Sequence, residues 1–88
     1  MMDPLEESRV QITATDRELL AALNRRLELV RRLHDYKQRE GLPLRDPARE
    51  QALVAALQSE NAGPLSADAV ARFFHFVLDL TREEIHGV

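Results

Sequence analysis

The first forty residues carry a stripe of positions spaced alternately three and four residues apart, most of them apolar. In chain order the stripe consists of Arg9, Ile12, Asp16, Leu19, Leu23, Arg26, Val30, Leu33 and Lys37. Such spacing marks one face of an amphipathic helix. Gly41 and Pro43 follow the stripe and are typical of the residues just beyond a helix. The pattern therefore predicts one long helix from about Glu7 to Glu40.

Two shorter helices are predicted by their capping residues. Asp46 is a typical N-cap and Pro47 suits the first helical position, so a second helix should run to about Glu60. Ser66 is another N-cap, before a helix that should end near Ile85. No segment shows the alternating pattern of a strand. We expect an all-α fold with three helices.

The length of the first helix bears on assembly. The span from Arg9 to Lys37 corresponds to about 42 Å at ~1.5 Å per residue. A compact globule of this chain length has a diameter of only about 30 Å. The two shorter helices cannot cover a helix that long, so we expect an intertwined homodimer in which two long helices share their apolar faces.

The composition excludes several classes of protein. A net charge of −3 is opposite to the basic face of a nucleic-acid-binding protein. The absence of cysteine removes disulfides and zinc-thiolate sites and fits the reducing cytoplasm. The three histidines lack metal-ligand spacing, and no apolar run is long enough for a membrane span. We expect residues 1–88 to form a single cytoplasmic domain without a metal ion.

Several charged or polar residues occupy positions where apolar groups are expected. A charge on a buried helix face is costly unless it is paired or meets a ligand. Cations outnumber acids in this set, so an anionic small molecule is the expected partner. Each residue also has a structural alternative, such as a buried Arg26–Glu50 ion pair that fixes the dimer register. The set consists of Arg9, Arg26, Lys37, Arg49, Glu50, Thr81 and Glu84.

The order and spacing of these residues resemble the all-helical class of chorismate mutase. The resemblance covers Arg9 to about Ile85 and implies an intertwined dimer of three-helix subunits. It also implies a single-domain, monofunctional enzyme that converts chorismate to prephenate for phenylalanine and tyrosine synthesis, without a cofactor. The residues that carry it are Arg9-x-x-Ile12-x-x-x-Asp16, Leu19-Leu20-x-x-Leu23, Arg25-Arg26, Lys37 and Arg45-Asp46-x-x-Arg49-Glu50.

The resemblance implies a role for each residue. Arg26 matches the arginine that binds a substrate carboxylate, and Arg9 matches the one contributed across the dimer, so that the active sites are shared. Thr81 falls where a hydroxyl commonly contacts a carboxylate. The acidic pair near the ring hydroxyl corresponds to Asp46 and Glu50. A further basic group that lines the site corresponds to Arg49.

The ether oxygen of the bond that breaks is the second centre implied by the resemblance. Lys37 matches the lysine that donates a hydrogen bond to this oxygen, on which negative charge develops during the reaction. The family's second donor lies four residues after the hydroxyl residue, and in this sequence that position is Ile85. We expect Glu84 to take its place because the helical period selects it. To donate, Glu84 would have to be protonated, so activity should fall as pH rises.

Three alternatives remain. An isochorismate-pyruvate lyase on the same scaffold would usually depart from the run Arg45 to Glu50. A mutase for 4-amino-4-deoxychorismate is not distinguished by Asp46 and Glu50. A non-catalytic helical dimerisation module would use the charges to fix its register.

Overall fold

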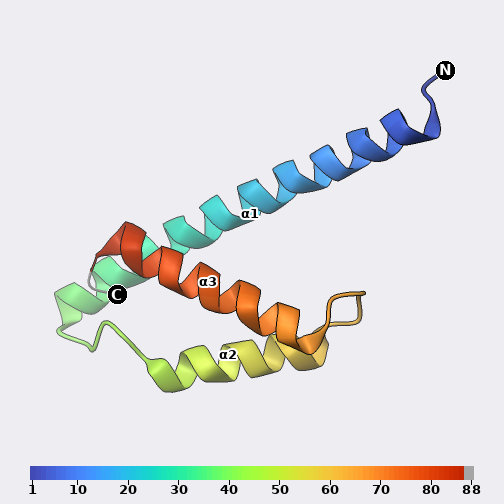
Figure 1. Ribbon diagram of the computed structural model, residues 1–88. Helices are drawn as coiled ribbons and strands as arrows, with labels where there is room; N and C mark the ends of the chain where they lie inside the picture. The colour runs from blue at the N-terminus through green and yellow to red at the C-terminus, as the bar shows by residue number, and fades with distance from the viewer. Residues whose placement is uncertain (87–88) are drawn as a thin grey trace. The chain divides into compact units, whose positions relative to one another are not determined.

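The structure, a computed structural model, describes residues 1–86 and contains three α-helices in that range. They are α1 (Pro4–Glu40), α2 (Pro47–Glu60) and α3 (Ala67–Ile85) (Figure 1). The described residues include no strand. The all-α prediction with one long N-terminal helix is therefore confirmed. No helix of this part of the chain has an apolar stretch suited to crossing a membrane.

α1 begins at Pro4, three residues before the predicted start at about Glu7, and a local cap explains why. The backbone N–H of Glu6 donates to Asp3 Oδ1 at 2.8 Å, and that of Glu7 donates to the Asp3 carbonyl at 2.9 Å. Asp3 therefore acts as an N-cap, with Pro4 at the first helical position. The same Asp-Pro signal begins α2, at Asp46 and Pro47.

The end of α1 is fixed by Gly41. This residue has a φ of 66°, and its N–H donates to the Gln38 carbonyl at 3.3 Å. The N–H of Leu42 donates to the Lys37 carbonyl at 2.8 Å. Together these bonds form a Schellman motif, which satisfies the last carbonyls of a helix. The predicted C-terminal stop is thus confirmed, and the motif closes the turn that carries Lys37.

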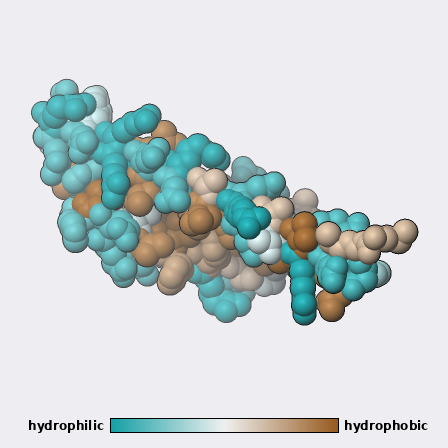
Figure 2. Space-filling model, turned by 90° about the horizontal axis from the view of Figure 1, so that it is seen from above, coloured by the Kyte–Doolittle hydropathy of each residue, from teal (hydrophilic) through white to brown (hydrophobic). Residues whose placement is uncertain are grey.

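The chain divides into two units, Met1–Arg32 and Leu33–Val88. The first unit consists of one helix, and every residue from 1 to 21 is exposed. Apolar side chains reach the surface on the face shown in Figure 2. In the first unit the exposed large apolar residues of the helix are Leu5, Val10, Ile12, Leu19, Leu20 and Leu29.

In the second unit α2 and α3 run antiparallel and lie side by side (Figure 1). Their shared core consists of Val54, Val70, Val77 and Leu78. α3 is capped as the sequence predicts, since Ser66 Oγ accepts a hydrogen bond from the Ala69 N–H at 3.0 Å. This antiparallel pairing brings the start of α2 close to the end of α3.

The loop between α2 and α3 is closed by side-chain amides. Gln58 Nε2 donates to the Ala67 carbonyl at 2.9 Å, and Asn61 Nδ2 donates to the Leu65 carbonyl at 2.7 Å. Asn61 Oδ1 in turn accepts from the Gly63 N–H at 3.2 Å. These bonds tie the end of α2 and the loop to the first residue of α3.

Candidate active site

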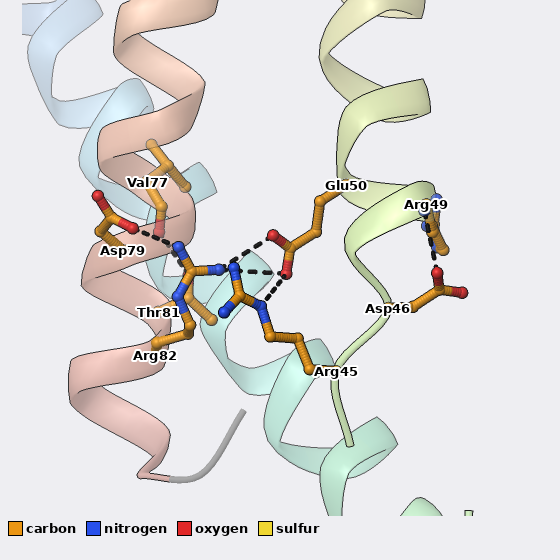
Figure 3. Close-up of polar contacts among 8 residues, drawn as sticks. All are labelled: Arg45, Asp46, Arg49, Glu50, Val77, Asp79, Thr81 and Arg82. Atoms are coloured by element: carbon orange, nitrogen blue, oxygen red, sulfur yellow. Dashed lines mark hydrogen bonds and ion pairs between the residues drawn. The ribbon is translucent and has the colours of Figure 1, made fainter. Parts of the chain in front are cut away.

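Four charged side chains meet where the first turn of α2 faces the last turns of α3. Arg82 Nη1 donates to both Glu50 oxygens, Oε1 at 3.1 Å and Oε2 at 3.0 Å. Arg82 Nη2 donates to Asp79 Oδ1, and Arg45 Nε lies 3.8 Å from Glu50 Oε1. Figure 3 shows Arg82 and Arg45 pointing toward the Glu50 carboxylate from different segments of the chain. We call Arg45, Glu50, Asp79 and Arg82 the charge cluster.

Partial burial makes the central pair of this cluster stronger than an ordinary surface ion pair. The side chains of Glu50 and Arg82 are 23% and 24% exposed. Desolvation alone would lower the pKa of Arg82, but its hydrogen bonds to Asp79 and Glu50, with the charges of those two groups, raise it above the ordinary arginine value. Arg82 is therefore a fixed positive charge at any physiological pH.

A pocket of about 270 Å³ lies over the charge cluster, within the second unit. All four members of the cluster line it, together with Pro47, Gln51, His75 and Leu78. A carboxylate offers about four lone-pair positions. Glu50 uses both oxygens for Arg82 and still has capacity to accept from a further donor.

Asp46 and Arg49 take local roles at the start of α2. Asp46 Oδ1 accepts from the Arg49 N–H at 3.1 Å, so Asp46 is the N-cap that the sequence predicts. The Arg49 side chain is exposed. Figure 3 shows Asp46 and Arg49 on the opposite side of α2 from the Glu50 carboxylate. The expectation that Glu50 points inward is confirmed, because it is half-buried as Leu53 and Leu57 are.

Thr81 lies on the buried face of α3, as the periodicity predicts, with 8% of its surface exposed. Its hydroxyl donates to the Val77 carbonyl at 2.7 Å. A hydroxyl has a single proton to donate. Donation to a substrate carboxylate would therefore require the Thr81 hydroxyl to turn away from Val77.

The sequence prediction that Glu84 lies on the inward face of α3 is wrong for the single chain. Glu84 is exposed, whereas Ile85 is half-buried. The buried face of α3 continues from Val77 through Thr81 to Ile85 in two steps of four, rather than in a step of four and a step of three. A period of 3.6 residues allows either step, and in this chain the half-buried residue is the one reached by the longer step.

The other predicted residues lie on α1. Lys37 is half-buried in the last turn of α1, within the second unit. It is the single lysine among twelve basic residues. In the first unit Arg26 is half-buried and makes polar interactions, whereas Arg9 is exposed.

Arg82 was missed by the sequence interpretation. It lies four residues after Leu78, so the same periodicity that selected Thr81 would place Arg82 at the edge of the inward face. Its pairing with Glu50 joins positions 32 residues apart and has no local signal.

Among residues 1–86 no group of three or more histidine, aspartate or glutamate side chains is arranged to hold a metal ion. The charge cluster alternates cations and anions, which suits recognition of a polar organic molecule better than chelation of a cation.

Comparison with known proteins places the chain in a family. A family model for chorismate mutase type II matches residues 8–85. A T-protein of Haemophilus influenzae is 41% identical over 71 residues, which are 78% of this chain and 19% of that protein. A T-protein of Enterobacter agglomerans is 40% identical over 60 residues, which are 68% of this chain and 16% of that protein. The chain thus spans less than a fifth of the length of these relatives.

Two solved structures of a chorismate mutase from Thermus thermophilus share the fold. Form I has a TM-score of 0.87 with 28% identity and covers 90% of this chain and 99% of its own. Form II has a TM-score of 0.89 with 26% identity and covers 98% of this chain and 100% of its own. Because the family model extends from the first turns of α1 to the end of α3, the chain belongs to the chorismate mutase type II family.

Proposed function

We propose that this chain is a chorismate mutase, an isomerase that converts chorismate to prephenate in the synthesis of phenylalanine and tyrosine. The observation that carries the proposal is the family match over residues 8–85. The reaction is an intramolecular rearrangement, so it needs neither a nucleophile nor a redox group. The protein has to hold the compact conformer and stabilise the charge that develops on the ether oxygen.

The two substrate carboxylates are assigned to arginines. Arg26 binds one of them from within the subunit, and Arg9 of the partner subunit binds a carboxylate across the dimer. The resemblance described above supports both roles. Thr81 adds a hydroxyl after the rotation that its bond to Val77 requires. Arg49 contributes positive charge at the rim.

The ether oxygen is assigned to Lys37 and Glu84. Lys37 carries an ammonium group that donates at neutral pH, and it sits in a turn fixed by the Schellman motif at Gly41. Glu84 donates only in its protonated form. Its exposed position within the single chain means that its role depends on the assembled site.

The ring hydroxyl is assigned to Glu50, with Asp46 beside it at the start of α2. The Glu50 carboxylate has its negative charge balanced by Arg82 and Arg45. A balanced carboxylate accepts from a neutral hydroxyl without attracting an ammonium group strongly. This feature favours chorismate over 4-amino-4-deoxychorismate, whose amine is protonated at neutral pH.

We further propose a homodimer with two shared active sites. The first unit is a single helix whose apolar stripe packs against no other element of that unit. Exposed apolar surface of this kind is typical of an interaction face, and a second copy of the same helix would cover it. A cytoplasmic location agrees with the absence of cysteine and with the proposed pathway.

The test is an assay of the purified chain with three substrates in parallel: chorismate, isochorismate and 4-amino-4-deoxychorismate. We expect rapid loss of chorismate absorbance with formation of prephenate and much slower turnover of the other two. Release of pyruvate from isochorismate as the main activity would instead identify a lyase.

A dimerisation module would turn over none of the three substrates. It would also gain no thermal stability from a dicarboxylate transition-state mimic, whereas a mutase that binds the mimic should melt at a higher temperature.

A further inference from the structure

We infer that Arg82 is a positioning residue that sets the substrate preference through Glu50: it orients the Glu50 carboxylate and balances its charge, so that the site accepts a ring hydroxyl rather than a ring ammonium. The inference rests on the proposed function and extends it to a residue outside the set that the sequence indicated.

The geometry supports the orienting role. One nitrogen of Arg82 donates to both oxygens of Glu50, while the other donates to Asp79 on the preceding turn of α3. The guanidinium is planar and its donors are fixed relative to one another. Asp79 therefore fixes Arg82, and Arg82 fixes the plane of the Glu50 carboxylate.

The electrostatics support the charge-balancing role. Glu50 and Arg82 are both about three-quarters covered, so their interaction is screened less than that of an exposed pair. The second cation, Arg45, is farther away and more exposed, with 53% of its side chain accessible. Most of the compensation for Glu50 therefore comes from Arg82.

Removal of Arg82 has two consequences that separate this role from general support of the fold. Glu50 becomes free to rotate, which weakens its contact with the ring hydroxyl. Its negative charge also becomes less compensated, because only the more distant and more exposed Arg45 remains, and this charge attracts an ammonium at the same position. A loss of fold stability would lower turnover of both substrates together, whereas loss of this role changes their ratio.

The experiment measures kcat/KM for chorismate and for 4-amino-4-deoxychorismate with the wild type, Arg82→Gln and Arg72→Gln. Arg72 is the matched control, because it also lies on α3 and pairs with an acid, Asp68, at 2.8 Å, but is 74% exposed. For Arg82→Gln we expect the chorismate-to-amine ratio to fall about tenfold, the size typical of one charge-assisted hydrogen bond. Arg72→Gln should leave the ratio unchanged.

A double variant links the effect to Glu50. Once Glu50→Gln has removed the carboxylate, adding Arg82→Gln should leave the ratio as it is in Glu50→Gln alone, because no charge remains to be balanced. If the Gln variant lacks the helical circular dichroism of the wild type, Arg82→Met takes its place under the same criteria.

The outcomes separate the inference from the proposed function. A wild type that turns over neither substrate would overturn the proposed mutase activity. If the wild type converts chorismate but Arg82→Gln leaves the chorismate-to-amine ratio unchanged, the positioning role alone is overturned. The same holds if the effects of Arg82→Gln and Glu50→Gln on this ratio are additive.

Discussion

At the scale of single residues, the structure shows Glu50 to be part of a built arrangement rather than an isolated acid. Its two oxygens meet Arg82, and a third group, Asp79, holds the other side of that guanidinium. The inward direction of Glu50 follows from the apolar spacing of α2. Its partner does not, because Arg82 is distant in the sequence and periodicity describes one helix at a time.

Lys37→Ala should lower kcat on the order of 10²-fold or more, the cost of removing a donor to developing negative charge. The measurement is the steady-state rate of chorismate loss. Arg39→Ala is the control, because Arg39 is an exposed cation in the same last turn of α1. Turnover that stays near the wild-type rate without Lys37 would refute the assignment at the ether oxygen.

Glu84→Gln should flatten the pH dependence of kcat. A glutamate donates to the ether oxygen only when protonated, whereas the glutamine amide donates at every pH. Wild-type activity should therefore decline as pH rises, the profile expected for an essential acid. Glu83→Gln, a change at the neighbouring exposed position, should keep the wild-type profile.

A flat wild-type profile would remove Glu84 from the mechanism. The period of 3.6 residues could not decide between Glu84 and Ile85 from the sequence, because both lie within one step of the face that contains Thr81. In the single chain Ile85 is half-buried and Glu84 is exposed, so the role of Glu84 at the ether oxygen stays a prediction about the assembled site.

At the scale of elements, the local sequence is sufficient to predict where the helices begin and end. The N-caps Asp46 and Ser66 and the terminating Gly41 act within four residues of themselves, so their signals are complete in the sequence. The same logic applies to Asp3 and Pro4, whose Asp-Pro signal marks the true start of α1. What the sequence could not provide is the side-chain network between α2 and α3, which depends on their packing.

Gly41→Ala should lower the free energy of unfolding by about 1 kcal/mol, the cost of a side chain in the left-handed region. Residue 41 has a φ of 66°, and an added Cβ would meet nothing within 4 Å, so backbone strain is the whole effect. Gly63→Ala is the control, because its Cβ would make only an ordinary contact at 3.6 Å with Asn61. Chemical denaturation of both variants measures the difference, and equal stabilities would argue against the strained cap.

At the scale of the whole molecule, the first unit is the part of the chain that most needs a partner. Its helix exposes a stripe that combines leucines and isoleucine with Arg9. Among the described residues, the small core between α2 and α3 contains four buried apolar side chains. A second copy of the chain would cover the stripe and supply Arg9 to a neighbouring site.

Shared active sites are tested most directly by mixing two inactive variants, Arg9→Ala and Lys37→Ala, after each has been unfolded and the two are refolded together in equal amounts. In a mixed dimer, one site would combine an intact Lys37 with an intact Arg9 from the other subunit, while the second site would lack both. Random pairing in a closed two-fold dimer should restore about a quarter of the wild-type chorismate mutase activity. A mixture that stays as inactive as the separate variants would contradict an active site assembled from two chains.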